Sequence, residues 1–267
     1  MHSKNHEMKD HGLLFKAEMV RANLEGRKTE TRRLVKKVDL ELIEYICGRH
    51  GEDIQLDGSD LGQAWRSGPE GFGHYIWIKD YLEAGRVRLS APYGGPGSRI
   101  YQKETWQATK WAHPSYEYPL EGSDVVSFAT FVPKSAEDSR GDGYDHMPWH
   151  VVYAADGDWG CREDRDFPWQ SPMFMPKWAA RAWFEVLDVR VERIQDIDDA
   201  GAIAEGIESS TRNSHWGGIM HGSAKVCHAR AWRAYQDLWD SINAKNGFPW
   251  KNNDWVRVIK YKRIENV

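Results

Sequence analysis

The stretch Gly26-Arg27-Lys28-Thr29-Glu30-Thr31-Arg32-Arg33 concentrates cations, hydroxyls and a carboxylate directly behind a short amphipathic segment. Apolar residues recur at helical spacing over 15–22, and Gly26 stands where a helix C-cap belongs. Lys28 and Thr31 are therefore predicted just past a helix end, on a turn or an entering strand. Such a turn can hold an amine near a hydroxyl, although a solvated basic turn would have the same composition.

The composition is that of a folded globular protein. Of the 267 residues, 28% are charged and 40% hydrophobic, enough for one large domain or two small ones. No apolar run approaches the roughly 18 residues of a membrane-spanning helix. The net charge of −4 argues against bulk coating of nucleic acid, so contact with a polyanion needs a local patch. One such patch contains Arg27, Lys28, Arg32, Arg33, Lys36 and Lys37.

The start of the chain and its cysteines indicate a cytoplasmic protein. Residues 1–11 are polar, lack the apolar centre of a signal peptide and are predicted to be a disordered tail. Cys47, Cys161 and Cys227 are widely spaced and odd in number. That usage is typical of a reducing compartment and not of a disulfide framework.

Periodicity along the rest of the chain predicts a mixture of strands and helices. Apolar and polar residues alternate from 183 to 194, as in a half-buried strand. A short helix is expected from Asp198 through Glu205 to Gly206. Further expectations are strands at 99–106, 151–155 and 255–264, a hairpin at 75–78 and 87–89, a weak helix at 39–47, a long helix at 224–244, and loops at 48–73 and 209–222.

This order of elements favours an α+β fold, because strands and helices do not alternate regularly. Segments 39–92 and 107–150 are interpreted as insertions into one domain covering 12–267. The second insertion is rich in Ser, Asp, Gly and Tyr. A long polar segment of this kind within a compact domain is usually a functional lid or a mobile loop.

The turn at 26–33 resembles the signature of ASCH domains, a branch of the PUA-like β-barrel superfamily. It is especially similar to that of the small bacterial N(4)-acetylcytidine amidohydrolases, which the core of the chain matches. The chain as a whole also resembles larger, phage-type ASCH-like proteins, through segments 96–106, 175–179 and 238–243. The resemblance implies a small β-barrel with flanking helices and long insertions, in a protein of a bacterial host or phage.

The resemblance also implies roles for individual residues. Lys28 matches the base, Thr31 the nucleophile and Arg33 the arginine that ends the motif, while Glu205 matches the helical proton donor. Arg32 and Arg33 would contact the substrate. The chain departs from the small enzymes at positions 30 and 32, where Glu30 and Arg32 replace apolar residues.

The chemistry these roles require is coherent. A threonine hydroxyl attacks only when a base takes its proton. Lys28 can be that base if burial or the charges of Arg27, Arg32 and Arg33 lower its pKa. Glu205 can protonate the departing amine if its own pKa is raised. An inward-facing Glu30 would instead pair with Lys28 and keep it protonated. A plain salt bridge between Lys28 and Glu205 is the structural alternative.

Two further groups of residues are candidates for substrate binding. Trp106 could stack on a base and Glu104 could read an exocyclic amine, unless both only pack at a strand end. Lys177 and Trp178 could line the same cleft or simply close the barrel. No cofactor is expected, and no metal either, because the spacing of His215, His221, Cys227 and His228 fits no tight metal motif.

Three functions are consistent with these observations. The first is an amidohydrolase that cleaves an N-acyl group from a cytidine-like nucleoside or modified base, with Thr31, Lys28 and Glu205 as its catalytic residues. The second is a non-catalytic reader of modified or structured nucleic acid. The third is a structural accessory protein of phage type. The expected partner is therefore a modified nucleoside or a nucleic acid, and not a membrane.

Overall fold

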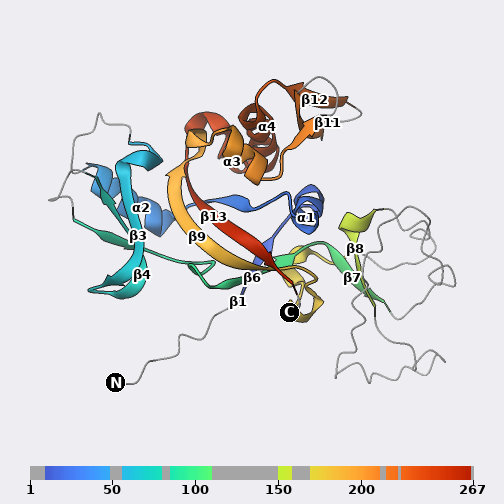
Figure 1. Ribbon diagram of the computed structural model, residues 1–267, viewed down its shortest axis with the longest axis horizontal. Coiled ribbons are helices and arrows are strands. Elements are labelled where there is room, and N and C mark those ends of the chain that lie inside the picture. Colours follow the sequence, from blue (N-terminus) through green and yellow to red (C-terminus); the bar gives the residue numbers. More distant parts are fainter. Residues whose placement is uncertain are drawn as a thin grey trace. The chain divides into compact units, whose positions relative to one another are not determined.

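The computed structural model describes most of the chain. The described residues are 10–48, 56–79, 85–109, 150–157, 169–210, 215–221 and 224–265. Within them the fold is mixed α+β, with helices and several separate sheets (Figure 1). No helix in these ranges is both long and apolar enough to cross a membrane.

Contacts divide the chain into two compact units. Unit 1 comprises Met1–His11, Glu25–Ile100 and Phe184–Val267, and unit 2 comprises Gly12–Leu24 and Tyr101–Trp183. The single domain predicted for 12–267, with its two insertions, stays a prediction.

The largest sheet has five strands in the order β1-β6-β9-β13-β2. Their bounds are Asp10–Leu14 for β1, Glu30–Leu34 for β2, Arg99–Lys103 for β6, Trp183–Arg193 for β9 and Trp255–Ile264 for β13. The predicted strands at 183–194 and 255–264 are confirmed as β9 and β13. Asp10 and His11 belong to β1, so they are not part of a disordered tail, whereas residues 1–9 lie outside the described residues.

The register of β2 determines which way the basic turn points its side chains. β13 and β2 are antiparallel, with Val258 opposite Arg32 and Ile259 opposite Thr31. Facing residues of neighbouring strands share a face of the sheet, so Arg32 lies with Val258 and Thr31 lies with Ile259 on the other side. Strand β2 thus continues the turn at the edge of the sheet, and its alternate side chains face opposite sides of the sheet.

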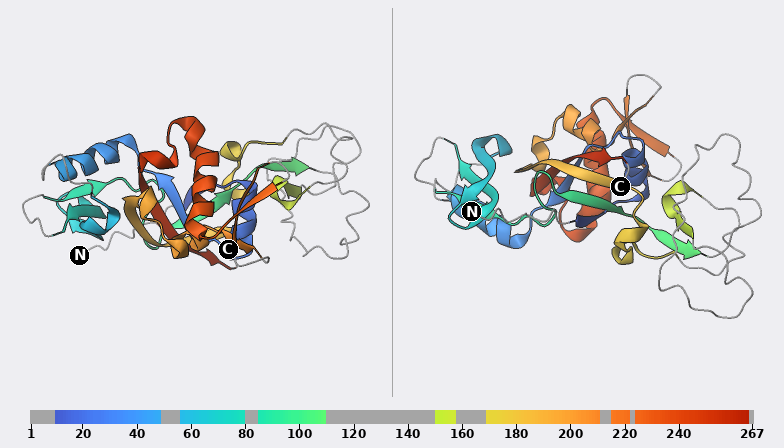
Figure 2. Two further views of the ribbon diagram at one scale, coloured as in Figure 1. Left: turned by 90° about the horizontal axis from the view of Figure 1, so that it is seen from above. Right: turned by 60° about the horizontal axis from the view of Figure 1, so that its bottom comes forward.

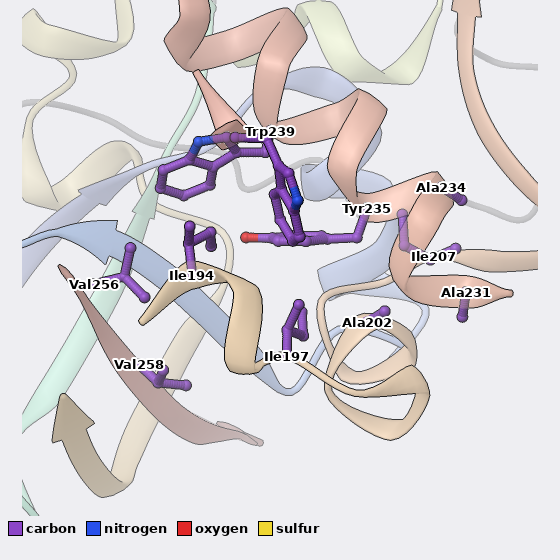
Figure 3. Packing of buried hydrophobic residues seen from close by; sticks show 11 residues of the cluster. Ile194, Ile197, Ala202, Ile207, Ala231, Ala234, Tyr235, Trp239, Val256 and Val258 are labelled. Carbon is purple, nitrogen blue, oxygen red and sulfur yellow. The ribbon is translucent and has the colours of Figure 1, made fainter. Parts of the chain in front are cut away.

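Helices α3 (Asp199–Ala204) and α4 (Ala231–Asn243) pack together (Figures 1 and 2). Their buried side chains share a core with Val258 of β13. The carboxylate of Asp198 caps α3 by accepting from the Gly201 amide at 2.7 Å. Figure 3 shows Tyr235 and Trp239 of α4 among the apolar side chains of this core. Its buried members are Ile194, Ile197, Ala202, Ile207, Ala231, Ala234, Tyr235, Trp239, Trp250, Val256 and Val258.

A second core of unit 1 lies between helix α2 (Lys37–Gly48) and an antiparallel sheet in the order β3-β4-β5. The three strands are Leu61–Gly68, Gly71–Ile78 and Val87–Leu89. The hairpin predicted at 75–78 and 87–89 is confirmed as β4 and β5. The loop predicted at 48–73 is wrong for 61–68, which form β3 paired along its length with β4, and for 71–73, which begin β4.

Unit 2 contains helix α1 (Ala17–Leu24) and the antiparallel pair β7 (Trp106–Thr109) and β8 (His150–Tyr153). Short 3₁₀ turns follow at Ala154–Asp156, Pro172–Phe174 and Lys177–Ala179. Its core contains Trp106, Val151, Tyr153, Met175 and Ala179.

Strands β10 (Glu208–Ser210), β11 (His215–His221) and β12 (Ala224–His228) form a further antiparallel sheet. The loop predicted at 209–222 is therefore wrong where these strands occur, and the long helix begins only at Ala231. The strands of the described ranges form four separate sheets with no closed barrel among them, so only the α+β class is established.

Candidate functional site

Lys28 and Glu205 are brought together within unit 1 by the turn at 26–29 and the end of helix α3. Helix α1 ends at Leu24, and Gly26 turns the chain with φ 73°, a value that favours glycine. The Thr29 amide then donates to the Ala204 carbonyl at 2.8 Å, which docks the turn against the end of α3. Glu205 is the C-cap residue of that helix.

The two side chains form a buried ion pair in unit 1. Lys28 Nζ donates to Glu205 Oε2 and, at 3.0 Å, to the backbone carbonyl of the same residue. The exposed fraction of the side chain is 0% for Lys28 and 2% for Glu205. Burial of a complete pair costs less than burial of either charge alone, so each residue depends on the other for its place.

Glu205 accepts several more hydrogen bonds through its second oxygen. Oε1 receives the Arg32 backbone amide at 2.6 Å and the Tyr235 hydroxyl at 3.2 Å, and Arg32 Nη1 lies 3.4 Å away. The Arg32 guanidinium also lies 5.9 Å from the centroid of the Tyr235 ring. Both carboxylate oxygens are therefore satisfied by buried donors.

A second layer of charge surrounds this group. Arg32 Nε and Nη2 donate to Glu192 Oε1 at 2.9 and 2.8 Å. Arg190 contacts both oxygens of Glu30 at 3.2 Å and donates to Glu192 at 2.9 Å. Glu30 thus has Arg190 and, at 3.6 Å, Arg32 as partners. No ion pair between Glu30 and Lys28 is found among the described residues.

Burial and charge move the pKa values of the pair in specific directions. Burial lowers the pKa of Lys28 below its ordinary value, although the attraction of Glu205 opposes this. Burial alone would raise the pKa of Glu205, but the charges of Lys28, Arg32 and Arg33 outweigh it and hold that pKa low. Burial and the charge of Glu205 raise the pKa of the Tyr235 hydroxyl. Glu205 is thus a carboxylate and Tyr235 a neutral donor at neutral pH.

Thr31 and Arg33 are placed differently from Lys28. Thr31 is buried, with 2% of its surface exposed, and lies beside Ile259 on the face of β2 opposite Arg32. Within the described part of the chain, no hydrogen bond joins the Thr31 hydroxyl to Lys28 or Glu205. Arg33 shares the Thr31 side of the strand, yet its charge lowers the pKa values of Lys28 and Glu205.

The other predicted binding residues lie in unit 2. Both Glu104 oxygens accept from Arg181, at 3.0 and 2.8 Å, and Gln102 donates to Glu104 at 2.9 Å. Trp106 packs edge-on against Trp178 with ring centroids 5.8 Å apart. In the same unit, Lys177 Nζ lies 5.4 Å from the Trp183 ring centroid. Glu104 therefore takes part in a buried ion pair.

Four residues of these sites were not predicted. Tyr235 lies within the long helix expected at 224–244, and its hydroxyl contact with Glu205 leaves no trace in helical periodicity. Glu192 and Arg190 occupy the polar side of a strand, where charge is expected without any site. Arg181 carries no motif. The one available signal for Glu192 and Arg190 was that their charges on β9 are complementary to those of Arg32 and Glu30 on β2.

Metal ligation has no support in the described residues, which contain no cluster of three or more His, Cys, Asp or Glu side chains suited to an ion. His228 Nε2 lies 2.6 Å from Asp237 Oδ2. The side chains of His215, His221 and Cys227 lie outside the described residues.

Comparison with known proteins identifies no relative. No protein-family model matches the sequence, and searches of curated proteins and of solved structures find no match.

Proposed function

We propose that this chain is an amidohydrolase that removes an N-acyl group from a cytosine-type base, with Lys28 and Glu205 as its proton-transfer pair. The observation that carries the proposal is the burial of these two groups in direct contact. A lysine with a lowered pKa is what a base near neutral pH requires.

The pair can carry out the proton transfers of amide hydrolysis. Transfer of the Lys28 proton to Glu205 along their hydrogen bond leaves a neutral amine and a protonated carboxyl group. The amine takes the proton of the attacking hydroxyl as its oxygen bonds to the acyl carbon, and the Glu205 carboxyl group protonates the base nitrogen as the C–N bond breaks. Water then releases the acyl group from the attacking oxygen. No proton is created or lost, and the pair returns to its starting state.

The role of Thr31 as nucleophile in this proposal comes from the family resemblance, as does the expected PUA-like fold. Its hydroxyl must reach Lys28 Nζ, whereas the register of β2 puts Thr31 on the opposite side from Arg32. Attack by Thr31 therefore requires the turn at 26–28 to rearrange when substrate binds. A water molecule activated by Lys28 is the alternative nucleophile for the same reaction.

The test is incubation with a panel of N(4)-acylated cytidines, followed by chromatography of the products. Wild type should deacylate at least one member, and Lys28→Met should not. Thr31→Ser should retain activity that Thr31→Ala loses if threonine attacks, while both should remain active if water attacks. Lys262→Met, which removes an exposed cation, is the matched control. Turnover that survives in Lys28→Met would overturn the proposal.

A non-catalytic reader of modified bases is the second candidate, and one observation favours it. Glu205 accepts from Lys28, Arg32 and Tyr235, and its pKa is lowered, so it holds no proton to donate in this arrangement. A reader would bind acylated cytidine without consuming it. Loss of one neutral hydrogen bond in Thr31→Ala would then change affinity by only about 1 kcal/mol.

A further inference from the structure

One face of the β3-β4-β5 sheet combines arginines with aromatic rings. Leu61, Ile76 and Ile78 point from these strands into the core beneath α2. The alternation of the strands then puts Trp77 and Arg66 on the opposite face. That face also carries Tyr75 and Arg88, which are directly paired across β4 and β5, and Arg86 lies just before β5. We call these five residues the arginine face.

Glycines let the large side chains of this face approach the backbone of the sheet closely. A Cβ atom at Gly62 would come 2.1 Å from the Trp77 indole, and one at Gly68 would come 2.5 Å from the Tyr75 ring. A Cβ atom at Gly73 would come 2.3 Å from Arg88 Nε. Each of these distances is far below ordinary van der Waals contact, so a side chain at any of the three positions would displace its neighbour.

The arginines lie over the rings. The Arg66 guanidinium carbon is 4.7 Å from the Trp77 ring centroid and 5.8 Å from that of Tyr75. Arg86 approaches Trp77 from 5.8 Å. These distances are those of cation–π contacts, which hold a guanidinium against a ring without neutralising its charge.

Among the residues that the structure describes, no carboxylate pairs with the arginines of this face. The strands β3, β4 and β5 contain two arginines and no Asp or Glu. Arg66, Arg86 and Arg88 form no ion pair within the described ranges, and Arg88 donates a hydrogen bond to the Phe72 carbonyl at 2.9 Å. By contrast, seven arginines elsewhere each have a carboxylate within 4 Å: Arg27, Arg32, Arg99, Arg181, Arg190, Arg230 and Arg257.

We propose that the arginine face binds single-stranded nucleic acid. Phosphates would pair with Arg86 and Arg88, which are exposed, while bases would stack on the Trp77 ring and on the guanidinium plane over it. A sheet face with aromatic and cationic planes suits unpaired bases, which offer their faces, better than a duplex, which hides them. The proposal uses none of the residues of the Lys28–Glu205 site and does not depend on the proposed hydrolysis.

The experiment is fluorescence anisotropy with labelled oligothymidylate and oligouridylate, with a duplex of mixed sequence and with heparin as a polyanion that lacks bases. Single strands should bind most tightly, and the two oligonucleotides distinguish a DNA from an RNA ligand. Two phosphate contacts predict a slope of about −1.4 for the logarithm of affinity against that of salt concentration. Raising salt fourfold should therefore weaken binding roughly 7-fold.

Variants separate the two parts of the interaction. Arg86→Gln with Arg88→Gln should reduce the steepness of the salt dependence by about 1.4. Trp77→Leu should weaken oligonucleotide binding roughly 5- to 100-fold and leave heparin binding unchanged. Lys262→Gln with Arg263→Gln removes the same charge from exposed positions of β13 and should retain full binding.

Three outcomes would overturn the proposal. One is absence of single-strand binding by a folded wild type. Another is a loss of binding in the β13 control variant equal to that in the arginine variant, which would show that the ligand is attracted to net charge and not to this face. The third is an affinity for heparin equal to that for oligonucleotides together with no effect of Trp77→Leu. The arginine variants replace exposed side chains, so they keep the test valid if Trp77→Leu fails to fold.

Discussion

At the scale of single residues, the Lys28–Glu205 pair is costly to bury, but the loss of one member alone is more costly still. Two charges removed from water lose hydration that their attraction only partly restores. The pair is nevertheless complete, because the Arg32 amide and the Tyr235 hydroxyl satisfy the remaining oxygen. Its removal as a whole should therefore matter less than the loss of one member.

A double-mutant cycle makes this quantitative. Lys28→Met should lower the free energy of unfolding by about 3–5 kcal/mol, because it leaves the Glu205 charge buried without its main partner. Glu205→Gln should lower the free energy of unfolding by a similar amount, since it leaves the Lys28 ammonium buried without its carboxylate partner. The double variant should recover much of the loss, and urea unfolding of all four proteins gives the coupling energy.

The exposed pair of Lys262 and Glu185 is the control for this cycle. Its nitrogen and oxygen lie 2.9 Å apart, but 59% and 38% of the two side chains are exposed. Solvent screening should reduce its coupling to about 0–1 kcal/mol. A Lys28–Glu205 coupling no larger than this would contradict the burial on which the site is built.

His74 provides a pH prediction that is independent of any catalytic role. Its ring is fully buried against Trp65, with 5.6 Å between ring centroids, and neither ring nitrogen has a hydrogen-bond partner within the described residues. Burial, with a smaller contribution from Arg257 and against the attraction of Asp39, lowers its pKa to about 4. An unfolded chain has the ordinary value of about 6.5, so it binds the proton more readily.

Stability should therefore fall as the pH is lowered. The His74 contribution is fully present above about pH 6.5 and is lost as the pH falls toward about 4, with a total of about 3 kcal/mol. His74→Leu should remove this part of the slope in urea unfolding measured across that range. An unchanged slope in the variant would show that another group titrates there.

At the scale of elements, the sequence predicted the strands and helices whose signal lies within their own residues. The alternation of 183–194 predicted β9, the segment 255–264 was predicted as the strand β13, and the glycine stop at Gly26 marked the end of α1. The helix from Asp198 to Gly206 has the cap that its sequence indicates. In these elements the signal comes from the segment itself, so no distant contact was needed.

Strand β3 shows why the rest could not be predicted. Its sequence Leu61-Gly62-Gln63-Ala64-Trp65-Arg66-Ser67-Gly68 has turn-forming residues where a strand has bulky ones. The structure gives the reason, because the Trp77 and Tyr75 rings occupy the space above two of its glycines. The neighbouring strand β4 supplies the bulky side chains that a strand usually carries itself. A prediction made from the residues of β3 alone does not include this neighbour.

Gly62→Ala tests this explanation. The added methyl group would overlap the Trp77 indole, so the ring must move, and we expect a loss of about 1–3 kcal/mol in the free energy of unfolding. Gly48→Ala is the matched control, since nothing lies within 4 Å of its added Cβ. That substitution should be neutral or slightly stabilising. Equal stability of both variants would contradict the packing of Trp77 on β3.

At the scale of the whole molecule, the sequence predicted that Lys28 and Glu205 would meet but not what surrounds them. The resemblance of the turn supplied Lys28, and the matched position on a helix supplied Glu205. Tyr235, Arg32 and Glu192 join them only because α4, β2 and β9 converge in unit 1. Such convergence depends on tertiary packing, and no spacing within one segment records it.

If the two proposals describe one protein acting on one ligand, its substrate is a polymer. The arginine face would then collect an oligonucleotide that carries an N(4)-acylated cytosine, while the Lys28–Glu205 pair performs the chemistry. The value of kcat/KM for the oligonucleotide should fall steeply with salt, because neutralised phosphates release counterions. For the free nucleoside it should be nearly independent of salt.

The variant Arg86→Gln with Arg88→Gln should separate the two steps. It should raise KM for the acylated oligonucleotide and leave kcat at saturation unchanged, because these side chains bind the substrate and do not touch the reacting atoms. Turnover of the free acylated nucleoside should be unaffected. A matching loss on the nucleoside would mean that the arginines act through the fold, and unchanged kinetics on both substrates would assign the arginine face to a different ligand.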